Sequence, residues 1–127
     1  MKLVTTANMT VRISGVLLLL LGIWIWTGRG AQVIPVHELL GFVLVLGLWT
    51  LAFLAARAGV TVGLVVLGFA WGLIAPALGL TQANLITGDL HWIIQVIHLL
   101  VGVGAIGIAE QLAVRIRARG AGIPARA

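Results

Sequence analysis

The 127-residue chain is dominated by apolar residues: 61% are hydrophobic, only 9% are charged, and the formal net charge is +5. A soluble domain of this length needs more polar surface, and the chain is too short for two domains. The absence of cysteine excludes disulfides, zinc–thiolate sites and iron–sulfur clusters. The basic residues gather at the ends of apolar segments, where membrane topology explains them better than nucleic-acid binding does.

Four segments are apolar and long enough to cross a bilayer, which takes about 20 helical residues because the hydrocarbon core is about 30 Å thick. We predict spans over residues 11–27, 35–56, 60–78 and 89–115. The first resembles a signal peptide, but no small-x-small cleavage pattern follows it, so we expect a retained span. Continuous apolar runs favour helices over a barrel. The predicted fold is an all-α integral membrane four-helix bundle, one domain over residues 1–127.

Residues that start and stop helices bound these spans. Pro35 fits a first helical position, and Asp89 fits an N-cap. Glycines mark the breaks between spans: Gly28, Gly30, Gly59, Gly79 and Gly88. Two further groups of glycines provide small faces for close helix packing: Gly68 and Gly72, and Gly102, Gly104 and Gly107.

The basic residues set the predicted direction of the spans. With the N-terminus inside, the inner side carries seven of them: Lys2, Arg12, Arg57, Arg115, Arg117, Arg119 and Arg126. The outer side, with loops over residues 28–34 and 79–88, carries only Arg29. This positive-inside bias predicts that both termini are cytoplasmic. The arginine- and alanine-rich ends favour a multi-pass protein of a bacterial inner membrane.

Ionisable residues within a membrane are costly and usually functional, and the three histidines all fall in the outer half of the bundle. His91 and His98 share a helix face but lie about 10 Å apart along the axis. One metal ion, with ligand nitrogens about 2 Å away, cannot bind both. A compact three-histidine metal site is therefore not expected. His37 and His98 instead lie at similar depths above the inner basic residues.

The second and fourth helices match when they are offset by 61 residues. The offset aligns His37-x-Leu-x-Gly41 with His98-x-Leu-x-Gly102, which predicts two helix pairs related by a two-fold axis along the membrane normal. Each glycine lies about one turn below its histidine and removes a side chain that would obstruct a flat plate. Two histidines at similar depth on facing helices suit a b-type haem, whose iron takes one axial ligand on each face.

With four spans and these two motifs, the chain resembles the membrane b-type cytochromes, including the cytochrome b561-like four-helix haem proteins. The resemblance implies one haem b per chain, bound through His37 and His98, and electron transfer that often involves a quinone. The chain departs from the two-haem members of that group, which need four ligand histidines, because it has only three.

Roles can also be predicted for several other polar residues. Arg29, the only outer basic residue, is expected to contact the haem propionates. His91 has three open interpretations: an interfacial residue, an alternative haem ligand, or a proton or quinone contact. Glu110 is expected to pair with a nearby arginine. The tryptophans of the outer half fit an interfacial belt: Trp24, Trp26 and Trp92.

The predicted function is a membrane-embedded b-type haem protein that carries electrons near the outer face, exchanging them with quinol or a periplasmic partner. The sequence has no visible nucleophile–base or oxyanion arrangement that would indicate a self-contained enzyme. A small transporter or channel, and a cofactor-free structural or assembly subunit, remain as alternatives. The first span lacks the embedded carboxylate on which small four-helix drug exporters depend. The glycine-rich faces favour a homodimer, and the basic ends favour contact with anionic lipid.

Overall fold

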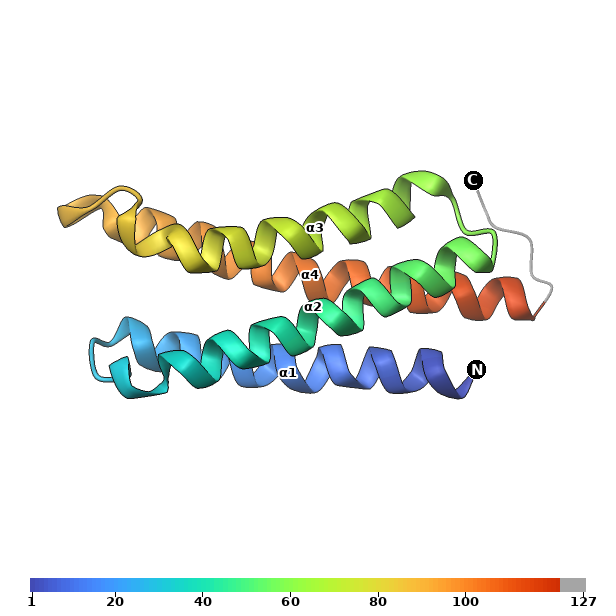
Figure 1. Cartoon of the computed structure of the whole chain (residues 1–127), viewed down its shortest axis with the longest axis horizontal. Coiled ribbons are helices and arrows are strands. Elements are labelled where there is room, and N and C mark those ends of the chain that lie inside the picture. The colour runs from blue at the N-terminus through green and yellow to red at the C-terminus, as the bar shows by residue number, and fades with distance from the viewer. Residues whose placement is uncertain (122–127) are drawn as a thin grey trace.

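The computed structural model describes residues 1–121, which form four long helices in antiparallel order (Figure 1). The helices are α1 (Lys2–Trp26), α2 (Ile34–Arg57), α3 (Val62–Thr81) and α4 (His91–Gly120). Short 3-10 turns lie in the loops: η1 (Ala31–Val33), η2 (Gln82–Asn84) and η3 (Gly88–Leu90). All four helices are long and apolar enough to cross a membrane. The predicted all-α four-helix bundle is confirmed; Arg126 lies outside the described residues.

The helix ends differ in part from the predicted spans. α1 begins at Lys2 and α4 continues to Gly120, because polar and basic residues extend both helices beyond their apolar stretches. Pro35 lies in the first turn of α2, as predicted. Asp89 as the N-cap of the fourth helix is wrong: it lies in η3, Leu90 occupies the cap position, and no side chain caps α4.

Three of the predicted glycine breaks have a backbone conformation that favours glycine. Gly28, Gly59 and Gly88 have φ values of 76°, 69° and 83°, in the left-handed region. Gly79 as a break is wrong, because it lies inside α3. The helix continues past it to Thr81, whose hydroxyl donates a hydrogen bond of 2.7 Å to the carbonyl of Ala77.

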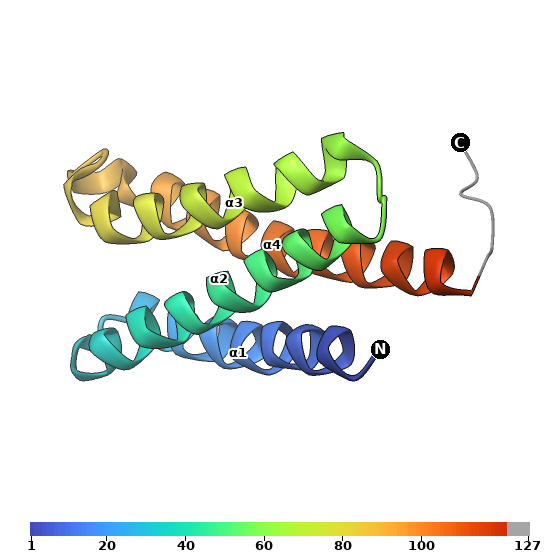
Figure 2. The ribbon, with the colours of Figure 1, turned by 45° about the vertical axis from the view of Figure 1, so that its right-hand side comes forward.

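The helices form a ring in which each contacts the next, and α2 also contacts α4 across the ring. In Figures 1 and 2 the α1–α2 pair and the α3–α4 pair diverge toward the end that carries the α1–α2 and α3–α4 loops. We call this the loop end, and the opposite half, where α1 begins and α4 ends, the terminal half. The two halves are packed differently.

The terminal half contains most of the buried core. Four of its larger side chains are fully buried: Val11, Leu48, Leu51 and Leu112. Small residues let the helices come close: Ala52, Ala55, Ala109 and Ala113 are equally buried. In a membrane, where lipid is as apolar as leucine, such close packing is what holds helices together.

The predicted small faces are confirmed at three of five glycines. A Cβ added to Gly68 would lie 3.1 Å from Leu112 and 3.2 Å from Ala52, so a larger residue here would force these neighbours to shift. Gly72 lies against the Trp49 indole and Gly104 against the Trp71 indole. Close packing of Gly102 and Gly107 within the chain is wrong, since a Cβ on either would meet nothing within 4 Å.

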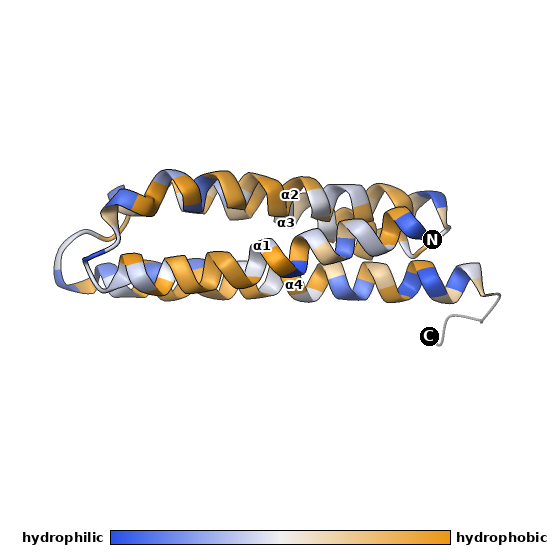
Figure 3. Ribbon diagram, turned by 90° about the horizontal axis from the view of Figure 1, so that it is seen from below, coloured by the Kyte–Doolittle hydropathy of each residue, from blue (hydrophilic) through white to orange (hydrophobic). Residues whose placement is uncertain are grey.

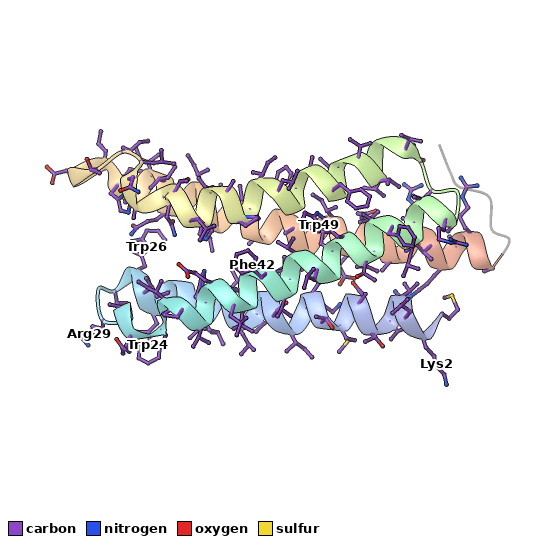
Figure 4. The ribbon with its side chains drawn as sticks, viewed as in Figure 1. Lys2, Trp24, Trp26, Arg29, Phe42 and Trp49 are labelled. Atoms are coloured by element: carbon purple, nitrogen blue, oxygen red, sulfur yellow. The ribbon has the colours of Figure 1, made fainter. Side chains whose placement is uncertain are left out.

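Two tryptophans join neighbouring helices through their indole N–H groups. Trp49 Nε1 of α2 donates to the carbonyl of Phe69 on α3 over 3.2 Å (Figure 4). Trp71 Nε1 of α3 donates to the carbonyl of Val101 on α4 over 2.8 Å. Each indole covers the glycine three residues after the accepting carbonyl. These bonds attach each indole ring to the next helix.

Polar residues concentrate toward the ends of the bundle, and the middle is largely apolar (Figure 3). One ion pair lies in the terminal half: Arg12 donates from Nε to Glu110 Oε1 over 2.5 Å and from Nη2 to Oε2 over 2.7 Å. The predicted pairing of Glu110 with an arginine is confirmed. This two-bond contact joins α1 to α4 across 98 positions of sequence.

Candidate functional site

A cavity of about 390 Å³ lies in the loop-end half, and all four helices contribute to its wall. Its size falls within the range of about 300–1,000 Å³ that is common for small-molecule and cofactor sites. Most of the wall is apolar, and it includes Trp26 of α1 and Phe42 of α2 (Figure 4). The cavity exists because the two helix pairs diverge here and no side chain large enough to close the space projects into it.

His37 of α2 and His98 of α4 meet at this cavity. Their ring centroids are 6.2 Å apart and their planes are tilted by 49°. Both residues line the cavity and are about half-buried. The structure therefore brings together the two histidines that the 61-residue offset aligns.

Each imidazole of the pair has one nitrogen, Nδ1, to which no described residue forms a hydrogen bond. The Nδ1 atoms of His37 and His98 are buried and have no hydrogen-bond partner among residues 1–121. A buried polar atom without a partner lowers stability, since it has lost its hydrogen bonds to water. The pair is therefore suited to a partner that binds from within the cavity.

Four glycines surround the two rings in two different ways. Gly22 and Gly79 lie directly against them: an added Cβ would be 3.4 Å from His37 Cε1 and 3.1 Å from His98 Cε1 respectively. Gly41 and Gly102 line the cavity, but a Cβ on either would meet no atom within 4 Å. The first two bring helices close to the rings, and the second two leave space beside them.

Gly22 and Gly79 are the site residues that sequence reasoning missed. They lie on α1 and α3, the helices that carry no histidine, and their contacts depend on how those helices cross α2 and α4. The pattern His-x-x-x-Gly within one helix identified only Gly41 and Gly102. A signal for the other two was a glycine near the outer end of each preceding span, but glycines are frequent throughout this chain.

Polar side chains are also part of the cavity lining. They are Glu38 of α2, Gln82 of η2, and His91 and Gln95 of α4. His91 Nδ1 lies 3.2 Å from the carbonyl oxygen of Leu85, to which it donates, so a neutral His91 has its Nε2 available as an acceptor. The structure therefore brings His91 to the same cavity as the histidine pair.

Arg29 is not part of this cavity. It lies exposed in the loop after α1, and Figure 4 shows it at the loop end beside Trp24. The part of the lining that belongs to residues 1–121 contains neither lysine nor arginine. An acidic group of a bound molecule would meet neutral donors here, such as the amides of Gln82 and Gln95, in place of the expected guanidinium.

The side chains also limit which metals fit. Within residues 1–121 there is no group of three or more histidine, cysteine or acidic side chains arranged to hold a metal ion. His37 and His98 provide two nitrogen ligands, whereas a bound zinc ion typically takes three or four protein ligands. Two imidazoles suffice for a metal that arrives with its other ligands already in place.

Comparisons of the chain with protein-family models, with characterised proteins and with solved structures find no match. Proposals about its function therefore depend on the residues and the geometry described above.

Proposed function

We propose that this chain is a membrane-embedded b-type haem protein that carries electrons, with His37 and His98 as the two axial ligands of one haem b. The observation that supports it most is the pair of neighbouring imidazoles, with ring centroids 6.2 Å apart, at an apolar cavity. Two metal–nitrogen bonds of about 2 Å, together with the depth of each ring, put the centroids of two axial imidazoles about 6 Å apart. The observed separation agrees with that spacing.

The ligand count supports a haem over a free metal ion. A porphyrin provides four nitrogens to its iron, so the protein needs to add only one ligand on each face. His37 and His98 are such a pair, and each has a buried Nδ1 that lacks a partner within residues 1–121. A bound metal with two open positions would use the nitrogens of these rings.

The shape of the cavity supports a flat and largely apolar ligand. The wall around the two rings is mostly aliphatic and aromatic, which favours burial of an apolar plate. Gly41 and Gly102, each one turn from its histidine, leave open space where a side chain would stand. Glycine at these two positions is therefore consistent with a macrocycle between the helix pairs.

When bound, the haem would supply one-electron chemistry at its iron. The chain's own residues would hold and orient it: the two imidazoles fix its position between α2 and α4. The apolar wall, including Phe42 and Trp26, excludes water from it. Burial and axial ligation are two of the factors by which a protein sets the reduction potential of a haem.

The positive-inside bias would put the loop end at the outer face of a bacterial inner membrane. We therefore propose exchange of electrons there with a quinol or a periplasmic redox partner. The 61-residue match between the helices of His37 and His98 supports the proposed two-fold internal repeat. The glycines against the two rings do not follow that offset, since Gly22 and Gly79 are 57 residues apart.

The test is an absorption spectrum of the full chain, purified from cells with ample haem. We expect a Soret band that sharpens and shifts on reduction with dithionite, as is typical of low-spin bis-histidine haem. A colourless protein from such cells would contradict the proposal and leave the transporter and the cofactor-free subunit as the alternatives.

A further inference from the structure

We infer that Gly22 and Gly79 are positioning residues that set where the two imidazoles stand. The contacts themselves are independent of any bound group, but their effect on a cofactor rests on the proposed haem function. Each glycine belongs to the helix that precedes the histidine in the chain, so α1 supports His37 and α3 supports His98.

The distances show how little space separates each ring from its supporting helix. A Cβ on Gly79 would lie 3.1 Å from His98 Cε1, which is inside the usual separation of about 3.5–4.0 Å between carbon atoms. A Cβ on Gly22 would lie 3.4 Å from His37 Cε1, close to the usual separation. An added methyl group at Gly79 therefore displaces the His98 ring by a few tenths of an ångström, whereas one at Gly22 displaces the His37 ring by little or nothing.

The ring, and not the helix, is expected to yield to the added methyl group. Cε1 lies at the far end of the histidine side chain, and both rings border the cavity, which has space to accept a movement. Replacement of a helical glycine by alanine also favours the helix itself. The substitution should therefore change the position of the ring without unfolding the bundle.

A displaced ring should be a poorer metal ligand, because an imidazole binds a metal only in a narrow range of distance and orientation. A ring moved away from α3 no longer presents its nitrogen at the same angle to a partner between the helix pairs. Since the Gly79 contact is the shorter one, His98 should be the more sensitive of the two ligands.

The experiment compares Gly79→Ala and Gly22→Ala with Gly63→Ala. Gly63 is a matched control because it lies on α3, like Gly79, but a Cβ there would meet nothing within 4 Å and it does not line the cavity. The first readout is the electron paramagnetic resonance spectrum of the oxidised haem protein, which reports axial-ligand geometry. The second is the ¹⁵N NMR spectrum of labelled histidine in the haem-free protein.

We expect Gly79→Ala to shift the low-spin resonance and the His98 imidazole signals, Gly22→Ala to shift those of His37 by less, and Gly63→Ala to change neither. Gly79→Ala spectra that match those of Gly63→Ala in both readouts would overturn the inference. If the wild-type protein is obtained without haem from haem-replete cells, the proposed function is refuted. If the His98 signals of the haem-free protein nevertheless change in Gly79→Ala, the positioning role is supported. Should Gly79→Ala fail to fold, Gly22→Val, whose larger side chain must displace the His37 ring, is compared with Gly63→Val; His37 signals that are the same in the two variants would overturn the inference.

Discussion

The terminal half and the loop-end half of the bundle have similar apolar composition but opposite packing. In the terminal half, Leu48, Leu51 and Leu112 are fully buried, and Gly68 lets α3 approach both α2 and α4. In the loop-end half, the glycines at 41 and 102 meet no neighbour and a cavity of about 390 Å³ remains. Apolar residues alone therefore do not decide how closely membrane helices pack; the placement of small residues relative to large ones does.

The polar groups of the two halves differ in the same way. In the terminal half, Arg12 and Glu110 use each other as partners through two hydrogen bonds. In the loop-end half, His37 and His98 are left with buried Nδ1 atoms that no residue in 1–121 satisfies. The terminal half also has one such atom, Oδ1 of Asn8, so the difference is that the loop-end half brings two of them together on neighbouring rings at a cavity.

Among the variants considered, loss of either His37 or His98 should have the largest effect on haem binding in the loop-end half. We expect His37→Ala or His98→Ala to remove the low-spin haem signature and most of the bound haem, because one axial position is lost. His91→Ala should retain the low-spin bands, since the ring that lies next to His37 is that of His98 and not that of His91. Absorption and electron paramagnetic resonance spectra check this, and loss of the signature in His91→Ala alone would show that the wrong histidines are paired.

A side chain that fills the open space beside the histidines should also reduce the haem content, but by less than the loss of His37 or His98 does. Gly102→Leu inserts a side chain into the cavity and should lower the haem-to-protein ratio severalfold. Gly107→Leu is the matched control: it lies on the same helix, has the same empty surroundings for a Cβ, and is outside the cavity lining. Equal haem content in the two variants would mean that the cavity is not where the haem binds.

A cavity created in the packed half should destabilise the fold more than truncation of an exposed chain near the histidines. Leu112→Ala removes a side chain with 0% exposure, and its cost should fall toward the lower end of the about 2–5 kcal/mol typical of buried leucines, because an apolar surrounding reduces the transfer part of that cost. Phe42→Ala, at a residue 47% exposed, should cost less. Unfolding of both haem-free variants in a denaturing detergent series checks the difference; the opposite order would mean that the loop-end half is the stable one.

The Arg12–Glu110 pair should make the smallest contribution to the free energy of unfolding, because the Arg12 side chain is 51% exposed. We expect Glu110→Gln to lower the free energy of unfolding by less than Leu112→Ala does and to leave the haem spectrum unchanged. A double-mutant cycle with Arg12→Met isolates the pair, and a coupling free energy near zero would show that it does not hold α1 against α4.

Local sequence patterns were sufficient for several features of this protein. The lengths of the four apolar segments predict the four helices, because a bilayer-spanning backbone must satisfy its own hydrogen bonds. Gly28, Gly59 and Gly88 mark turns correctly, since the conformation they adopt is one that glycine favours. The 61-residue offset predicts that His37 and His98 belong together, as periodicity places them at matching positions of two helices.

Only the tertiary structure decided which residues touch across helices. Gly79 is followed by two more helical residues and lies against His98, although the sequence around it reads as a break. Gly22 contacts His37, whereas Arg29, expected at the same site, lies in an exposed loop away from the cavity lining. The pattern within one helix fixes which residues share a face. The crossing of two helices, set by the sum of many small contacts along them, fixes what that face meets.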